Sequence, residues 1–212
     1  MAQLDERYFY NNNSDQTSIE SSLEQDEQIL WRGKPHKGSF ILDKIFKMLP
    51  IVIVWLAFDS FFIIMIFNNG LSGMPSFMSI GLIIFFLIHL MPVWIWLKNV
   101  LTASTQHKNL EYVFTNKRII IRSGVIGIDY KNIYYTDISG VNLRVGLVDK
   151  MFKVGDIYIT ALRNSVVLYD IKDPYFITSK LQKICNDIKS DIYFPNALRK
   201  DYNEGFNTKY KG

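Results

Sequence analysis

Two apolar stretches decide the fold of this chain: MLPIVIVWLAFDSFFIIMIF at residues 48–67 and FMSIGLIIFFLIHLMPVWIWL at residues 77–97. Each is about 20 residues long, and an α-helix of that length spans roughly 30 Å, the thickness of the hydrocarbon core of a bilayer. The residues between the two stretches carry no charge. This pattern predicts a transmembrane helical hairpin within residues 46–98.

Positive charges flank the hairpin on the side away from its connection. Lys44 and Lys47 precede the first stretch, and Lys98 follows the second. Under the positive-inside rule, this asymmetry predicts a multi-pass plasma-membrane protein with both termini in the cytoplasm. The first stretch begins too far into the chain, and is too long, for a cleaved signal peptide. The alternative, two buried helices of a soluble protein, is disfavoured because two such long apolar runs lie so close together.

The residues before the hairpin divide into two parts. Residues 1–25 are rich in Asn, Ser, Gln and acids without apolar periodicity, which predicts a disordered acidic tail. Residues 26–45 contain a Gly/Pro turn among cations and are interpreted as an interfacial segment. Its aromatic and basic side chains suit the headgroup region of a membrane, although the cations could equally serve only to fix topology. These interfacial residues are Trp31, Arg32, Lys34 and Lys37.

After the hairpin, short segments rich in β-branched and aromatic residues alternate with turn residues. This pattern predicts a small antiparallel sheet or barrel. The expected strands are residues 110–114, 118–122, 124–128, 132–135, 138–143, 155–160 and 165–171. Residues 147–152 interrupt the series and are either one helical turn or a long connection.

An amphipathic helix is predicted after the strands. Asp173 suits an N-cap and Pro174 the first helical position. Apolar residues then recur on one face and predict that the helix covers the end of the barrel. That face consists of Ile177, Leu181, Ile184, Cys185 and Ile188. Residues 191–212 are polar and are interpreted as a loose C-terminal tail.

Four segments in order, YVFTNKRIIIRSGVIG, IYYTDISGVNL, KVGDIYIT and VVLYDIKDP, resemble the bacterial PH (pleckstrin-homology-like) domains of membrane-anchored proteins. The matching positions are Thr115, Arg118, Gly124, Gly155, Asp173 and Pro174. The resemblance implies a PH-like domain over residues 108–190, capped by a C-terminal helix, on the cytoplasmic face of a bacterial inner membrane. The fold class is therefore a membrane α+β protein. PH-like folds host lipid, peptide and protein binding, so the resemblance implies no settled activity.

Two groups of side chains are candidate sites. Asp59 and His89 are the ionisable residues within the apolar stretches, and counting from the connection puts them at depths that differ by roughly 6 Å. We expect these residues to form an intramembrane polar pair that locks the hairpin. The alternative is a functional role, as a proton relay. The second group, Lys117, Arg118 and Arg122, surrounds a β-turn. By analogy with the basic first hairpin of eukaryotic PH domains, it could contact an anionic headgroup, although strand-end cations more often mark a solvated edge.

The sequence contains no recognisable catalytic, cofactor or metal motif: GxxxxGK[ST], GxSxG, HExxH and CxxC are all missing. Scattered aspartates such as Asp129, Asp137, Asp149 and Asp156 lie beside turn residues and are interpreted as turn formers. Cys185 is the single cysteine, so no internal disulfide is expected. Lys and Arg are dispersed rather than striped, which argues against nucleic-acid binding.

The sequence thus predicts a non-catalytic interaction module at a bacterial membrane, without cofactor or metal. Its expected partners are anionic inner-leaflet lipids and a protein partner or a second copy of the chain. The alternative is a sensor of anionic lipid headgroups or of envelope stress. A less favoured alternative is a small subunit of a transporter complex that uses Asp59 and His89.

Overall fold

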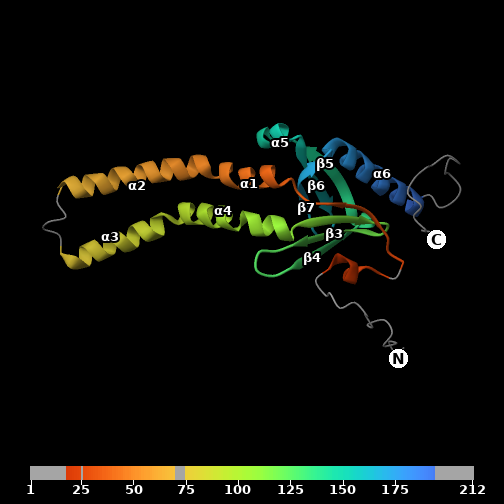
Figure 1. Cartoon of the computed structure of the whole chain (residues 1–212), viewed down its shortest axis with the longest axis horizontal. Coiled ribbons are helices and arrows are strands. Elements are labelled where there is room, and N and C mark those ends of the chain that lie inside the picture. The colour runs from red at the N-terminus through yellow and green to blue at the C-terminus, as the bar shows by residue number, and fades with distance from the viewer. Residues whose placement is uncertain (1–17, 25, 70–74, 194–212) are drawn as a thin grey trace, which may run out of the picture.

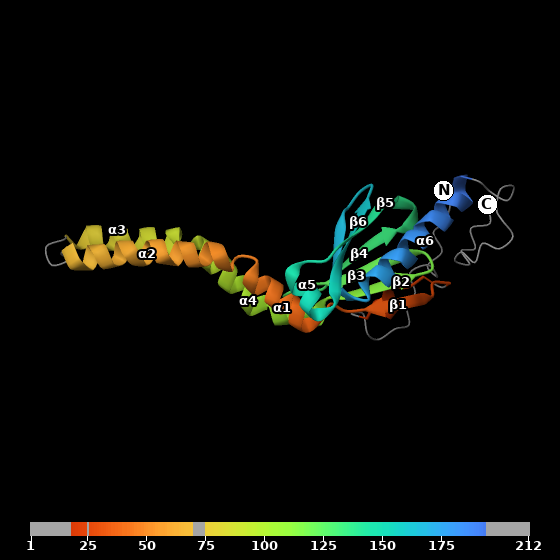
Figure 2. The same cartoon turned by 90° about the horizontal axis from the view of Figure 1, so that it is seen from above.

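A long helical arm projects from one end of a β-rich domain (Figure 1). The structure is a computed structural model and describes residues 18–24, 26–69 and 75–193. The arm consists of α1 (Lys37–Phe46), α2 (Leu49–Asn69), α3 (Ser76–His89) and α4 (Met91–Asn109). Its two legs run in opposite directions, with α1 and α2 packed along α4 next to the domain. Seen from above, the arm keeps the same elongated form (Figure 2).

The second leg of the arm is bent by 49° between α3 and α4. The break lies at Leu90, and Pro92 stands in the first turn of α4, where the missing N–H of proline leaves no hydrogen bond unmade. The prediction of one uninterrupted helix over residues 77–97 is therefore wrong. The polar residues after 97 also remain helical, because α4 continues along α1 and buries Ala103 completely before it ends at Asn109.

The first sheet has four antiparallel strands in the order β1 (Ile29–Gly33), β2 (Glu111–Thr115), β3 (Arg118–Ser123) and β4 (Asp129–Tyr134). In β1, Trp31 lies opposite Phe114 of β2, and the two rings are 4.6 Å apart. Residues 29–33 of the predicted interfacial segment are thus a strand of the domain, and their place at a membrane interface stays a prediction. A start of the domain at residue 108 is too late, because its first strand precedes the whole arm.

The second sheet has three antiparallel strands in the order β5 (Ile138–Arg144), β6 (Val154–Ala161) and β7 (Val166–Lys172). The 3-10 helix η4 (Tyr135–Asp137) links the two sheets, and the short helix α5 (Leu147–Phe152) fills the connection that the sequence left open. Six of the seven expected strands match β2 to β7 to within a few residues.

The remaining expected strand, residues 124–128, is instead an exposed loop between β3 and β4. Gly124 has φ of +143°, and a Cβ there would lie 1.9 Å from the carbonyl oxygen of Gly127. Such a backbone is open only to glycine and turns the chain out of the sheet. The apolar side chains of this segment consequently face solvent, with Ile126 completely exposed.

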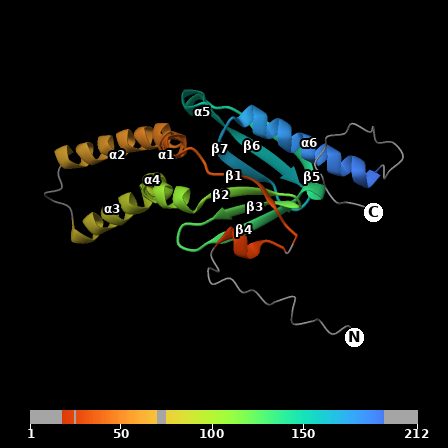
Figure 3. The ribbon, with the colours of Figure 1, turned by 45° about the vertical axis from the view of Figure 1, so that its right-hand side comes forward.

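The core lies between the two sheets and beneath α6 (Pro174–Tyr193). The predicted apolar face of α6 is confirmed: four of its five residues are buried and Ile184 is partly buried. Gly155 lets α6 begin close to the sheet, because a Cβ at this position would lie 3.1 Å from the Pro174 ring. Figure 3 shows α6 running along the second sheet.

The acidic segment before β1 is ordered against the first sheet where it is described. Residues 18–24 include the 3-10 helix η2 (Ile19–Ser22), and Ile19 is 2% exposed against Val113 and Ile120. The prediction of disorder over residues 1–25 is therefore wrong for 18–24, because this segment buries an apolar side chain and neutralises its acids against the sheet. Residues 1–17 and 25 lie outside the described residues, as does the predicted tail beyond residue 193.

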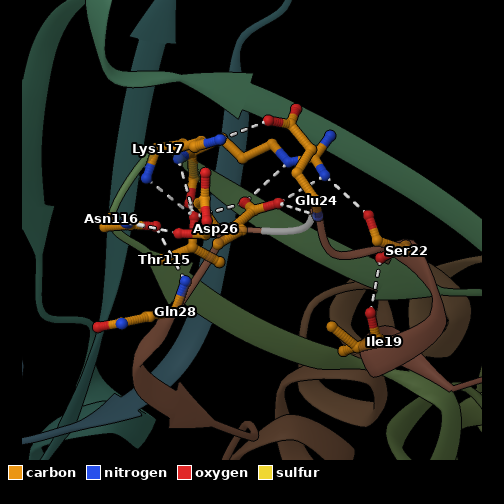
Figure 4. A network of polar contacts seen from close by, with 10 residues as sticks. Ile19, Ser22, Glu24, Asp26, Gln28, Thr115, Asn116 and Lys117 are labelled. Carbon is orange, nitrogen blue, oxygen red and sulfur yellow. Dashed lines mark hydrogen bonds and ion pairs between the residues drawn. The ribbon is translucent and has the colours of Figure 1, made fainter. Parts of the chain in front are cut away.

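Glu27 fastens this segment to the turn between β2 and β3. Its carboxylate accepts hydrogen bonds from the Thr115 hydroxyl at 2.7 Å and from the Arg118 guanidinium at 2.8 and 3.0 Å. Arg118 also donates to the carbonyl of Ser22 at 2.8 Å. Figure 4 shows the surrounding contacts, including the 2.7 Å ion pair between Lys117 and Glu24. Thr115 and Arg118, two of the family-like positions, thus serve a buried structural link.

The protonation of Glu27 follows from these contacts. Burial by itself would raise the pKa of the carboxyl, but the hydrogen bonds from Arg118, the Glu24 backbone and Thr115 outweigh burial and hold the pKa below its ordinary value of 4.5. A lowered folded-state pKa stabilises the fold above about pH 4.5. This contribution is lost as the pH falls through the lower folded-state value.

We predict that Glu27→Ala lowers the free energy of unfolding of the full chain by roughly 3–5 kcal/mol, because it leaves Arg118 buried without its carboxylate. Thermal unfolding of the chain in detergent micelles, followed by tryptophan fluorescence, measures this. Lys117→Ala is the matched control, since its ion pair with Glu24 is exposed and its loss should change little. Glu27→Leu combined with Arg118→Met should unfold at a higher temperature than Glu27→Ala. Equal midpoints for Glu27→Ala and the control would contradict the assignment.

Candidate functional site

The arm exposes apolar side chains along most of its length. Within the described residues, the stretch Lys37–Asn68, formed by α1 and most of α2 together, is long and apolar enough to cross a membrane, and the bent pair α3–α4 would count as a second if it forms one span. Only 11% of the apolar window in the first helix is buried. A core helix of a soluble domain would be mostly covered, whereas most of this window is exposed.

Asp59 and His89 face one another inside the arm. His89 Nδ1 lies 2.8 Å from Asp59 Oδ1, which is close enough for an ion pair, and Asp59 is 2% exposed. The angles do not meet those of a hydrogen bond, and neither carboxylate oxygen of Asp59 has a hydrogen-bond partner among the described residues. The predicted role of this pair in locking the hairpin stays a prediction.

Aromatic rings enclose His89. Its imidazole stacks on Trp55 with ring centroids 5.1 Å apart and on Phe85 at 5.2 Å. The indole of Trp55 also donates a 2.7 Å hydrogen bond to the His89 carbonyl, which α3 leaves free at its C-terminal end. These contacts tie α2 to the bend between α3 and α4.

A basic pocket of about 630 Å³ lies where the arm joins the domain. All four predicted interfacial residues line it, and so does Lys172 from the end of β7. Arg32 is held by ion pairs to Glu20 and Glu111, whereas Lys34, Lys37 and Lys172 are exposed and make no ion pair within the described chain. Apolar walls complete the pocket. They are formed by Trp31, Pro35, Ile171, Phe176 and Ile177.

The three cations proposed from the sequence for headgroup contact are already engaged. Lys117 pairs with Glu24, Arg118 is 7% exposed and pairs with Glu27, and Arg122 lies 3.9 Å from Glu111. These cations were suggested by analogy with the first hairpin of eukaryotic PH domains. In this chain β1 pairs with β2, so β2–β3 is the second hairpin of the domain and not the first. Headgroup contact at this turn stays a prediction.

A groove of about 510 Å³ runs between β5 and α6. Strand β5 is an edge strand of its sheet, so its outer backbone groups are not all used in pairing. Thr178 of α6 lines the groove and is 6% exposed, yet its hydroxyl has no hydrogen-bond partner in the described chain. The other walls combine apolar and amide side chains: Val141, Asn142, Leu143, Tyr175 and Gln182.

Three carboxylates gather at the junction between the arm and the domain. Asp43, Asp149 and Asp170 each offer one oxygen within 4.8 Å of the others. Burial raises the pKa of Asp170 to about 7; a hydrogen bond from Ser39 opposes this effect and the charge of Asp156 adds to it. Burial likewise raises the pKa of Asp156 to about 6, with Asp149 and Asp43 adding to the effect. Hence this cluster concentrates negative charge in a poorly solvated place.

Sequence reasoning missed this cluster because no short spacing connects its members. It interpreted Asp149 as a turn former, and Asp149 Oδ2 does accept the Gly146 N–H at 2.7 Å at the start of α5. Its other oxygen is 3.4 Å from the Ser39 hydroxyl of α1, a contact that only the folded chain creates.

A protein family and a solved structure resemble this chain. A crystal structure of a DUF1696 family protein with a pleckstrin-homology domain, from Shewanella loihica PV-4, is 21% identical to this chain. The match covers 34% of this chain and 68% of that one, with a TM-score of 0.28. No protein with a curated description matches the chain. The family model described as "Bacterial PH domain" matches residues 50–185, which includes most of the arm as well as β2 to β7. With that match spanning more than half of its length, the chain belongs to the bacterial PH domain family.

Proposed function

We propose that this chain is a non-catalytic, membrane-anchored interaction module. The observation that carries the proposal is the placement of the exposed apolar arm, which forms the entire connection between β1 and β2 of the PH-like domain. An arm of this kind needs a bilayer to cover it, and its two ends return to neighbouring strands. The domain is therefore fixed at one membrane surface.

Charge supports the cytoplasmic side for the domain. Lys44, Lys47 and Lys98 lie where the arm approaches the domain, whereas the residues at the far tip are uncharged. Positive charges are retained on the cytoplasmic side of membranes, so both termini belong there. Family membership makes the bacterial inner membrane the proposed location.

Exposed apolar side chains on the domain suit contact with the cytoplasmic leaflet of the membrane. The loop between β3 and β4 and the helix α5 both lie at the end of the domain from which the arm leaves (Figures 1 and 3). Ile126, Leu147 and Met151 are 102%, 85% and 76% exposed. Asn109, the last residue of α4, donates a 3.2 Å hydrogen bond to the Gly124 carbonyl and so holds the loop beside the arm. These tips would enter the interfacial region on either side of the arm.

We predict that Ser76→Cys reacts with a membrane-impermeant maleimide in intact cells, once any outer membrane has been opened, whereas Ser165→Cys reacts only after the inner membrane is lysed. Both positions are exposed, the first at the tip of the arm and the second between β6 and β7. The unchanged chain gives the background, because its one cysteine, Cys185, is buried. Labelling of Ser165→Cys from outside, or protection of both cysteines until lysis, would contradict the orientation.

The groove between β5 and α6 is the proposed site for a protein partner. An edge strand can accept an extended segment by strand addition, and the groove beside it supplies side-chain pockets. The groove combines apolar side chains with the amides of Asn142 and Gln182. A peptide with alternating apolar and polar side chains fits this combination.

We predict that a photo-crosslinking residue at Ser179, which lines the groove, captures one protein in stoichiometric amount from native membranes. The same residue at Asn132, on the exposed face of β4, is the control and should capture that protein far less. Mass spectrometry identifies the adduct, and capture of a second copy of this chain would mean self-association. Adducts with lipid only, or equal capture from both positions, would contradict a partner in the groove.

The basic pocket supports a second function, the binding of an anionic lipid headgroup. Its free cations Lys34, Lys37 and Lys172 surround the point where the connection between β1 and β2 begins. This connection is the true first hairpin of the domain, the position used for phosphate recognition in eukaryotic PH domains. Trp31 and Phe176 would pack against the less polar part of the ligand.

We predict that Lys34→Gln, Lys37→Gln and Lys172→Gln together weaken retention of phosphatidylglycerol by the purified chain on the order of 100-fold, since each surface cation contributes about 1 kcal/mol. Native mass spectrometry with titrated lipid measures the loss. The control removes three exposed cations elsewhere, at Lys131, Arg163 and Lys183. An equal loss in both triple variants would point to overall charge and would rule out a lipid site in this pocket.

A further inference from the structure

Three carboxylates from three separate elements meet at the junction between the arm and the domain. Asp43 comes from α1, Asp149 from α5 and Asp170 from β7. One oxygen of each lies within 4.8 Å of the others, and Asp149 and Asp170 are 3% and 1% exposed. Like charges held this closely in a buried place repel one another strongly unless something compensates for them.

Asp170 supplies a second and independent observation. Its Oδ1 is buried and has no hydrogen-bond donor among the described residues, although buried carboxylate oxygens are nearly always satisfied. The register between β6 and β7 shifts at this point, and Asp170 adopts φ of +53°. Asp156 holds this irregularity, because its carboxylate accepts the Asp170 backbone N–H at 3.0 Å. The bulge re-aims the Asp170 side chain relative to a regular strand.

Protein cations do not neutralise the cluster directly. Lys44, Lys47 and Arg144 act on Asp43 from a distance, but no Lys or Arg in the described ranges lies within 4.0 Å of any of the three carboxylates. Ser39 lies beside the cluster; it is fully buried, and its hydroxyl is 3.4 Å from Asp149 Oδ1. The repulsion within the cluster is therefore relieved either by protons on the carboxyls or by a bound cation.

We propose that Asp43, Asp149 and Asp170 bind a hard divalent cation, Mg²⁺ or Ca²⁺. Carboxylate and hydroxyl oxygens are the ligands that these ions prefer. Ca²⁺ binds oxygen at about 2.3–2.6 Å, so three oxygens spaced evenly around the ion are about 4.0–4.5 Å apart, and Mg²⁺ brings them to about 3.6 Å. Oxygens within 4.8 Å of one another thus already have nearly the required separation.

The site would couple the arm to the domain. Asp43 belongs to the helix that leads into the arm, whereas Asp149 and Asp170 belong to the domain, so one ion would draw together elements that otherwise repel. This role is independent of which ligand the groove or the basic pocket takes. It makes the cation a structural clamp at the base of the arm.

The test is a thermal unfolding experiment on the full chain in detergent micelles, first stripped with EDTA and then titrated with Mg²⁺ or Ca²⁺ separately. At a concentration about 100 times Kd, we expect the bound ion to raise the unfolding midpoint by roughly 5–10 °C. Asp170→Asn should unfold at the same or a higher temperature than the unchanged chain in EDTA, because it relieves repulsion. It should also lose the increase produced by the ion.

Asp129→Asn is the matched control, since Asp129 is an exposed carboxylate on β4, and it should keep the full increase. The larger midpoint shift of the two titrations identifies the preferred ion. The proposal is overturned if neither ion raises the midpoint of the unchanged chain at millimolar concentration. It is also overturned if Asp170→Asn retains the full increase, which would mean that the carboxyls share protons and the ion binds elsewhere.

Discussion

The antiparallel pairing of β1 with β2 is the interaction on which the rest of the structure depends. These strands come from opposite ends of the helical arm, and their register, with Arg32 opposite Val113, brings those ends side by side. Trp31 against Phe114 and Glu27 against Arg118 then fasten the incoming chain to the sheet. The arm is consequently an insertion between the first two strands of the domain.

This arrangement also distributes the charges of the molecule. The acidic segment ahead of β1 lies over the turn between β2 and β3 and neutralises cations there, through Glu24 and Glu27. The cations near the start of the arm, Lys34 and Lys37, have no such partners within the described residues. The domain therefore leaves positive charge available on the side of the arm and removes it at the opposite end of the strands.

The elements that could be predicted from the sequence are those whose residue pattern repeats within a short segment. Strands β2 to β7 and the helix α6 show a clear period within a few residues, so they could be predicted. Strand β1 could not, because ILWRG exposes three of its five residues and pairs with a strand on the far side of the arm. Residues 124–128 have the β-branched composition of a strand, but the backbone of Gly124 turns them outward. The approach of Asp59 to His89 follows from depth in two antiparallel helices, whereas Asp43, Asp149 and Asp170 share no spacing that could be recognised.

The position of the arm between β1 and β2 also governs the order in which the chain can fold. During synthesis, β1 leaves the ribosome well before its partner, and at about 5–20 residues per second the wait is several seconds. An unstructured connection from Gly33 to Glu111 would make closure of the sheet slow and entropically unfavourable. Helix formation in the arm shortens that connection to the gap between two adjacent helix ends. Closure of the first sheet is therefore easier once the arm has formed, so folding of the domain is coupled to folding of the arm.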